Sequence, residues 1–335
     1  TSMATKGYNS YRGRTSGGKI ALIVVLALVL VGALAYLALQ DYVVYDEAGN
    51  ARIELPFFHK KSEDQGDGAP GGDAQRDDIV DTVAPEHPHV EVAALHGTRL
   101  PDDCLWWGAD YIMNTLAPED LVLAVKRSTG GITYATGVET PRGVVVETGR
   151  PIECLNTLLQ SGRYTVGHLA CFLDSAYARA LPEAALVRED GQLWYDGQGQ
   201  AWLDPTNAQV LQYITALVKE CGELGFKEVL LDWFCYPADT TGAANIAPDK
   251  AQALADFAEK LRAALPEGVA LSVVVRDTES LSITQQAELF DRLYVPADGD
   301  LAAVKAALPA GYDPETRVVA MTAEAAQSGS YMIVQ

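Results

Sequence analysis

Strand and helix patterns alternate from residue 89 to the end of the sequence. Eight short apolar segments predict strands, at residues 90–95, 121–126, 164–173, 228–234, 269–275, 292–295, 317–321 and 331–334. Helical patterns separate most of them, at residues 106–116, 152–161, 210–224, 250–265, 284–289 and 301–308, and a hairpin is predicted at 132–136 and 144–147. Alternation over about 250 residues is typical of a (β/α)8 barrel. The sequence therefore predicts an α/β fold, TIM-barrel-like over residues 89–335, with a doubly wound open sheet as the alternative.

The clearest strand–helix unit lies between residues 204 and 234. Asp204-Pro205 ends any preceding structure, and Thr206 or Asn207 can cap the helix that follows. Apolar residues then recur at helical spacing on one face: Val210, Ile214, Leu217, Val218, Cys221 and Leu224. The next strand ends near Asp232, and ligands of parallel α/β folds bind at that end of the strands. Asp232 is therefore the first candidate for a functional residue.

Residues 172–237 resemble a family of TIM-barrel glycoside hydrolase domains found in bacterial envelope proteins. The W-x-D-P-x-N motif of that family is matched by Trp202, Asp204, Pro205 and Asn207, and its E-x-x-x-D strand end by Glu228 and Asp232, with Pro237 beyond it. Upstream, the likeness includes Phe172, Asp174, Pro182, Glu183, Leu193, Trp194, Asp196 and Gly199, and weaker matches are Lys126, Gly130 and Asp291. The resemblance implies a barrel fold, a glycan substrate and hydrolysis of glycosidic bonds.

The sequence departs from the family pattern at residues that would support catalysis. Cys235 stands where the family has an arginine three residues after the strand-end aspartate, and Val274 stands where the next strand has an acid. Around Lys126 the family is acidic, but this chain has Ala124 and Arg127. We therefore expect the domain to bind a glycan and to hydrolyse it slowly or not at all.

Glycosidic hydrolysis needs two carboxyl groups, ~5 Å apart for retention or ~6.5–9.5 Å apart for inversion of configuration. Asp232 is the first candidate for such a catalytic pair. Its partner is predicted to be Asp174 at the end of the third strand, because Asp174 matches the family, or Asp277 after the fifth strand. Glu279 and Glu324 also follow predicted strands.

Seven further residues are candidates for substrate binding: Lys126, Arg127, Trp194, Trp202, Asp204, Arg276 and Tyr294. Tryptophan rings can stack on sugar faces or pack in the core. Arg127 and Arg276 can bind the carboxylates of acidic sugars, or Arg276 can pair with Asp277 or Glu279. Trp233 would point away from Asp232 on a regular strand and pack between barrel and helices.

Composition and motifs exclude several other functions. The net charge of −20 argues against a nucleic-acid partner. No G-x-G-x-x-G motif follows the first strand, and the sequence has no P-loop and no G-x-S-x-G motif, which argues against nucleotide binding and esterase activity. The five cysteines and five histidines have no metal-ligand spacing. We expect neither a metal site nor a cofactor.

The first 88 residues predict a membrane anchor and a spacer. Residues 1–19 form a basic tail that we expect in the cytoplasm, and residues 20–39 are an uncharged run long enough to cross a ~30 Å hydrocarbon core. Residues 40–58 predict a juxtamembrane hairpin, and residues 59–88 a flexible acidic linker. The expected location is the cell membrane, single-pass, with the C-terminal domain extracytoplasmic. A cleaved signal peptide ending near Ala33-Leu34-Ala35 is the alternative.

The sequence is compatible with three classes of function. The first is an anchored glycosidase, retaining or inverting, that acts on an envelope or environmental polysaccharide. The second is a barrel that binds such a glycan without efficient hydrolysis. The third is a structural envelope protein that uses the barrel as a docking surface. Fold alone does not separate them, because TIM barrels host many functions.

The predicted topology can be tested with protease added to intact cells. Because residues 59–88 are poor in large apolar residues, we expect external protease to cut there and to release a folded fragment of residues ~89–335. The released fragment is measured by immunoblot before and after lysis. A C-terminal domain that stays protected until lysis would contradict the orientation.

Overall fold

The computed structural model describes residues 43–45, 51–53, 89–116 and 118–334. The chain divides into two compact units, residues 1–79 and 80–335. In the first unit, β1 (Val43–Tyr45) pairs antiparallel with β2 (Ala51–Ile53), within the segment for which the sequence predicts a hairpin. The predicted tail, the apolar run of residues 20–39 and the predicted linker lie outside the described residues. Among the residues that are described, no helix has both the length and the apolar character needed to cross a membrane.

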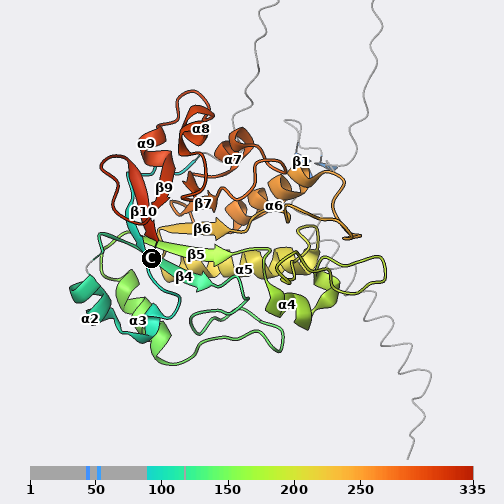
Figure 1. Ribbon diagram of the computed structural model, residues 1–335, viewed down its shortest axis with the longest axis horizontal. Helices are drawn as coiled ribbons and strands as arrows, with labels where there is room; N and C mark the ends of the chain where they lie inside the picture. Colours follow the sequence, from blue (N-terminus) through green and yellow to red (C-terminus); the bar gives the residue numbers. More distant parts are fainter. Residues whose placement is uncertain (1–42, 46–50, 54–88, 117, 335) are drawn as a thin grey trace, which may run out of the picture. The chain divides into compact units, whose positions relative to one another are not determined.

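The second unit contains a closed barrel of eight parallel strands, in the order β10-β3-β4-β5-β6-β7-β8-β9 (Figure 1). The strands are β3 (His96–Arg99), β4 (Asp120–Lys126), β5 (Thr165–Ala170), β6 (Glu228–Asp232), β7 (Ala270–Val274), β8 (Arg292–Val295), β9 (Val318–Thr322) and β10 (Ser330–Val334). This closure confirms the predicted TIM-barrel fold and excludes the open sheet.

Helices surround the strands on the outside of the barrel (Figure 1). They are α2 (Ala109–Tyr111), α3 (Arg150–Leu159), α4 (Ser175–Ala180), α5 (Ala208–Leu224), α6 (Lys250–Ala264), α7 (Ile283–Leu289), α8 (Leu301–Ala306) and α9 (Pro314–Arg317). The longest, α5, begins where the Asn207 side chain accepts hydrogen bonds from two backbone N–H groups of its first turn. Its apolar face is buried and packs toward the barrel, as the spacing predicts.

Three local predictions within residues 89–147 are wrong. The first strand is β3 and not residues 90–95; there, the Val90 N–H donates to the buried carboxylate of Asp291. The predicted helix at 106–116 is divided into a short turn (Cys104–Trp106), α2 and a π-helical segment (Ile112–Leu116), because Gly108 has a φ of 91°. The predicted hairpin at 132–147 is also not formed. Instead, Thr133 folds back on β4 through its backbone N–H and its hydroxyl.

The amino end of the barrel interior is closed by a buried ion pair. Glu228 opens β6 and accepts hydrogen bonds from Arg292 on β8, from Tyr164 at 2.9 Å and from Tyr294 at 2.7 Å. The Arg292 guanidinium also donates to the carbonyl oxygens of Ala93 and Thr316. A buried charge is tolerated only when it is paired and hydrogen-bonded, and this network meets that condition for Glu228 and Arg292.

An apolar layer fills the interior above this ion pair. It consists of Leu95, Val122, Val166, Leu230, Val274, Tyr294, Val319 and Met332, all buried. Inward-facing side chains alternate along each strand, so the same faces of β5 and β6 present His168 and Asp232 nearer the carboxyl end. Polar side chains therefore occupy both ends of the interior and apolar ones the middle.

The burial of α5 gives a test of the fold. Leu217 is fully buried on the apolar face of this helix, whereas Gln212 is exposed. We expect Leu217→Ala to lower the free energy of unfolding by ~2–5 kcal/mol through the cavity it leaves. The matched variant Gln212→Ala should change it by less than about 0.5 kcal/mol. Both values are measured by urea unfolding, and equal effects would show that the orientation of α5 is wrong.

Candidate functional site

Asp232 ends β6 and is the centre of a buried hydrogen-bond network at the carboxyl end of the barrel. Its Oδ1 accepts hydrogen bonds from Arg276 Nε at 2.8 Å and from the backbone N–H of Trp233 at 2.8 Å. Its Oδ2 accepts from Arg276 Nη2 at 3.1 Å and lies 3.1 Å from His168 Nε2. A carboxylate offers about four lone-pair sites. These four contacts occupy all of them.

The electrostatics of this network favour an ionised Asp232. Burial alone would raise the pKa of Asp232, but hydrogen bonds and charge attraction from His168 and Arg276 outweigh it and hold the pKa well below the usual range. Burial alone would lower the pKa of Arg276, but the hydrogen bond and the charge attraction of Asp232 outweigh burial and raise this pKa. Because the ionised carboxylate can only accept, His168 Nε2 carries the shared proton.

His168 was not among the candidate residues predicted from the sequence. It lies on β5, opposite Leu230 of β6, and is 8% exposed. Its Nδ1 is buried and has no hydrogen-bond partner among the described residues. The alternation of side chains along β5 could have identified it. His168 lies two residues before Ala170, which pairs with Asp232, so His168 is on the face of the strand that points into the barrel.

Trp233 departs from regular strand geometry directly after Asp232. Its φ of 53° is a left-handed conformation that non-glycine residues rarely adopt. The Arg276 guanidinium carbon lies 4.5 Å from the centroid of the Trp233 ring, and the Trp202 ring meets that ring edge-on at 5.8 Å. The strand therefore does not continue to residue 234 as predicted. Trp233 instead packs beside Arg276 at the end of the barrel.

Lys126 and Asp174 form a second buried pair. Lys126 Nζ lies 2.8 Å from Asp174 Oδ2 and donates to the carbonyl oxygen of Ala170 at 2.7 Å, and both charged side chains are fully buried. Asp174 Oδ1 accepts the backbone N–H of Tyr177 and so caps α4. A Cβ at Gly130 would lie 2.1 Å from that oxygen, so only glycine fits there. Since Ala170 pairs with Asp232, the two ion pairs belong to neighbouring strand ends.

The third predicted acid, Asp277, follows β7 by three residues. Its carboxylate accepts hydrogen bonds from the backbone N–H groups of Glu279 and Ser280, each at 3.0 Å. Arg276 pairs with Asp232 and not with Asp277 or Glu279, the two partners that the sequence allowed. Asp277 thus stabilises the loop in which it lies.

The remaining predicted binding residues are spread over several environments. Trp194 and Trp202 are buried, and their indole N–H groups donate to the Thr241 carbonyl and the Asp196 carboxylate. Asp204 accepts from Thr206 and Asn245, and Tyr294 lies in the interior against Glu228. Arg127 lies at the carboxyl end of β4, where its Nη1 is 3.3 Å from Glu147 Oε1, and its side chain is 20% exposed. The structure therefore brings together Asp232, Arg276 and His168, with Lys126 and Asp174 beside them.

The described residues contain no cluster of three or more histidine, cysteine, aspartate or glutamate side chains suited to a metal ion. All five cysteines are buried and unpaired. Burial raises the pKa of the Cys235 thiol to about 12, and charge repulsion from Asp277 and Asp232 adds to this shift. Cys235 is therefore a neutral thiol and not a charged partner of Asp232.

Structural comparison finds solved proteins of low sequence identity. A hypothetical protein from Ruminiclostridium thermocellum is 23% identical with a TM-score of 0.42, covering 55% of this chain and 98% of that one. An α-galactosidase from Thermus thermophilus is 17% identical with a TM-score of 0.42, covering 62% of this chain and 42% of that one. An α-galactosidase from Geobacillus stearothermophilus is 12% identical with a TM-score of 0.47, and the match covers 69% of this chain and 34% of that one. The chain thus spans less than half the length of either galactosidase.

Sequence comparison identifies a family. No curated protein sequence matches the chain. The profile of the family described as "Putative glycosyl hydrolase domain" matches residues 109–290, from α2 to the end of α7, which is more than half of the sequence. The chain belongs to this glycosyl hydrolase domain family.

Proposed function

We propose that the barrel is a member of this family that binds a glycan at the carboxyl end of its strands and hydrolyses it slowly or not at all. The observation that carries this proposal is the full occupation of the Asp232 carboxylate. A nucleophile needs a free lone pair, and a general base needs one directed at water or a substrate hydroxyl. Every lone pair of Asp232 is engaged by His168, Arg276 or the Trp233 N–H.

The first predicted partner of Asp232 and the position of the family's second acid also differ from what hydrolysis requires. A general acid must carry a proton and deliver it to the leaving oxygen. Asp174 pairs with Lys126 through one oxygen and accepts the Tyr177 N–H with the other, and it is fully buried. Val274, at the family's acid position, lies in the apolar layer of the barrel. These residues support glycan binding over efficient hydrolysis.

The binding surface that we propose is formed by Arg276 and Trp233. Arg276 contacts Asp232 through Nε and Nη2, and 28% of its side chain is exposed. Within the described part of the chain Nη1 has no hydrogen-bond partner, so it can donate to a sugar hydroxyl. Trp233 is partly buried beneath the guanidinium and offers an aromatic surface beside it. Planar cations and aromatic rings next to one another suit the mixed polar and apolar faces of a sugar.

The location that we propose rests on the sequence. The basic residues 1–19 and the uncharged residues 20–39 support a single-pass membrane anchor with the barrel outside the membrane. An extracytoplasmic barrel would meet envelope or environmental polysaccharide. The protease experiment on intact cells tests this placement separately from glycan binding.

A combined activity and binding assay tests the proposed function. Reducing ends released from a panel of envelope and plant glycans are measured for the wild-type chain, Asp232→Asn and Asp174→Asn, and glycan affinity is measured in parallel. We expect the three proteins to release reducing ends at the background rate. Arg276→Ala should weaken glycan binding about tenfold, because it removes a charge-assisted donor worth about 1.4 kcal/mol.

Arg163→Ala is the matched control for that assay. Arg163 precedes β5, at the opposite end of the barrel, so its loss should leave glycan affinity unchanged. Turnover by the wild-type chain that Asp232→Asn abolishes would replace the proposal with an active glycosidase that uses Asp232 with Asp174 or Asp277. Absence of binding to every glycan would favour a structural docking protein.

The ionised state of Asp232 predicts a pH-dependent contribution to stability. The pKa of Asp232 is lowered in the folded state. Its contribution to stability is therefore complete at pH values above ~3.9, the pKa of an aspartate in the unfolded chain, and declines as the pH falls below that value. At pH 7, Asp232→Asn should lower the free energy of unfolding by about 3–5 kcal/mol, since it leaves Arg276 and His168 without their anion. At pH 3 this difference should shrink by about 1 kcal/mol.

Urea unfolding at the two pH values provides the measurement. The control is Asp277→Asn, which should cost less than about 1 kcal/mol, because the carboxylate accepts only two loop N–H groups. A difference between wild type and Asp232→Asn that is the same at pH 7 and pH 3 would show that Asp232 is not held ionised in the folded state.

A further inference from the structure

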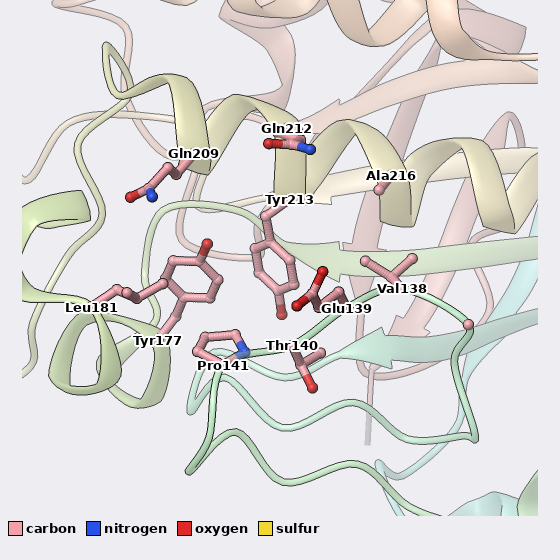
Figure 2. A pocket seen from close by; sticks show the side chains of 11 residues that line it. Val138, Glu139, Thr140, Pro141, Tyr177, Leu181, Gln209, Gln212, Tyr213 and Ala216 are labelled. Atoms are coloured by element: carbon pink, nitrogen blue, oxygen red, sulfur yellow. The ribbon is translucent and has the colours of Figure 1, made fainter. Parts of the chain in front are cut away.

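The side chains in Figure 2 line a pocket of about 620 Å³, which we call the flank site. One wall is the loop of residues 137–141, and the others are α4 and the first turns of α5. None of Asp232, His168 and Arg276 lines it. Its volume is within the range of about 300–1,000 Å³ that is typical of small-molecule sites.

The loop that forms one wall is held in place by a single side chain of α5. Glu220 Oε2 accepts hydrogen bonds from the hydroxyls of Tyr134 at 2.7 Å and Thr136 at 2.5 Å, and its Oε1 accepts the backbone N–H of Gly137 at 2.6 Å. Three hydrogen bonds to one carboxylate fix the beginning of the loop against the helix. The pocket is therefore formed in the absence of a ligand, which lowers the entropic cost of binding.

Tyr213 is the feature of this pocket that indicates a ligand. Its side chain points from α5 into the space between α4 and the loop (Figure 2) and is only 4% exposed. Its hydroxyl is buried and has no hydrogen-bond partner among the described residues. Burial and the nearby charge of Asp174 raise the pKa of Tyr213 well above its usual range, so the hydroxyl stays protonated. A buried donor without an acceptor is costly, and a bound acceptor removes that cost.

The other lining side chains define the chemistry of the ligand. The Tyr177 ring stacks on the Tyr213 ring at 4.4 Å, and Gln209 and Gln212 present exposed amides from α5. Glu139 is the one charged residue in the lining, so an anionic ligand would meet no cation. Aromatic rings with amide donors and acceptors suit an uncharged ring that carries many hydroxyl groups.

We propose that this pocket is a second carbohydrate site, which takes an uncharged pyranose unit. The sugar ring lies against the Tyr177 and Tyr213 pair, an oxygen of the sugar accepts from the Tyr213 hydroxyl, and Gln209 and Gln212 bind further hydroxyls. The site goes beyond the proposed strand-end function and does not depend on it. Both sites would bind sugars on one rigid barrel, so a long glycan that reaches both gains affinity by avidity.

The test measures the affinity of the full chain for neutral oligosaccharides of galactose, glucose and N-acetylglucosamine by calorimetric titration. The background is Arg276→Ala, which weakens the strand-end site. On this background, Tyr213→Phe removes only the unpartnered hydroxyl and Gln212→Ala removes one exposed amide. Each of these two substitutions should weaken binding about fivefold, which is the change in affinity that corresponds to the loss of one net hydrogen bond. Tyr213→Phe should unfold at an unchanged or higher urea concentration, which separates lost binding from lost folding.

Gln198→Ala is the matched control, because Gln198 is exposed and lies outside the pocket. It should bind as the Arg276→Ala background does. Binding that survives Arg276→Ala and falls in both pocket variants supports the flank site, even if the strand-end proposal fails. Loss of all binding in an Arg276→Ala variant that still unfolds cooperatively in urea, or pocket variants that bind like the control, would overturn the flank site and leave the strand-end proposal standing. No binding of any neutral oligosaccharide would also overturn it.

Discussion

Closing eight parallel strands into a barrel creates an interior in which every polar side chain must find its partner from another strand. In this chain the charged side chains of the interior meet that constraint in two polar layers. At the amino end, Glu228 is neutralised by Arg292. At the carboxyl end, Asp232 is neutralised by Arg276 and hydrogen-bonded to His168. The apolar layer between them excludes water from both networks, which strengthens each charge pair and makes an unpaired charge more costly.

The upper layer shows how a departure from the family pattern is accommodated. The resemblance leads us to expect an arginine at residue 235, and the chain has a buried neutral cysteine there. The guanidinium comes instead from Arg276, two residues beyond β7. Val274 and Arg276 are two positions apart along the chain, with Val275 between them. Arg276 reaches back over the apolar layer to Asp232, and the Trp233 ring packs against the guanidinium. The acid that would face this site in the family is replaced by an apolar side chain.

Local and nonlocal features differed in how far the sequence predicted them. Helix α5 and strand β6 were predictable, because apolar spacing and a capping asparagine are contained in a few residues. The buried pairs were not, because their members are far apart in the sequence: His168 and Asp232 by 64 residues, Arg276 and Asp232 by 44. Residue spacing cannot show such contacts before strand register is known. Strand β3 was misplaced because its pairing depends on neighbours at the opposite end of the sequence, in β10.

The geometry at Asp232 is that of a structural cross-link. One carboxylate joins β5 through His168, its own strand through the Trp233 N–H, and the residues after β7 through Arg276. Trp233 adopts a rare left-handed conformation in which its N–H reaches that carboxylate. A catalytic carboxylate needs the opposite arrangement, with a lone pair open to the substrate. An acid that holds three strand ends together can stabilise a binding surface above it. Our proposal that the domain hydrolyses glycans slowly or not at all follows from this arrangement, because attack on a sugar carbon would first require one of those contacts to break, and breaking a buried charge contact would add to the barrier of the reaction.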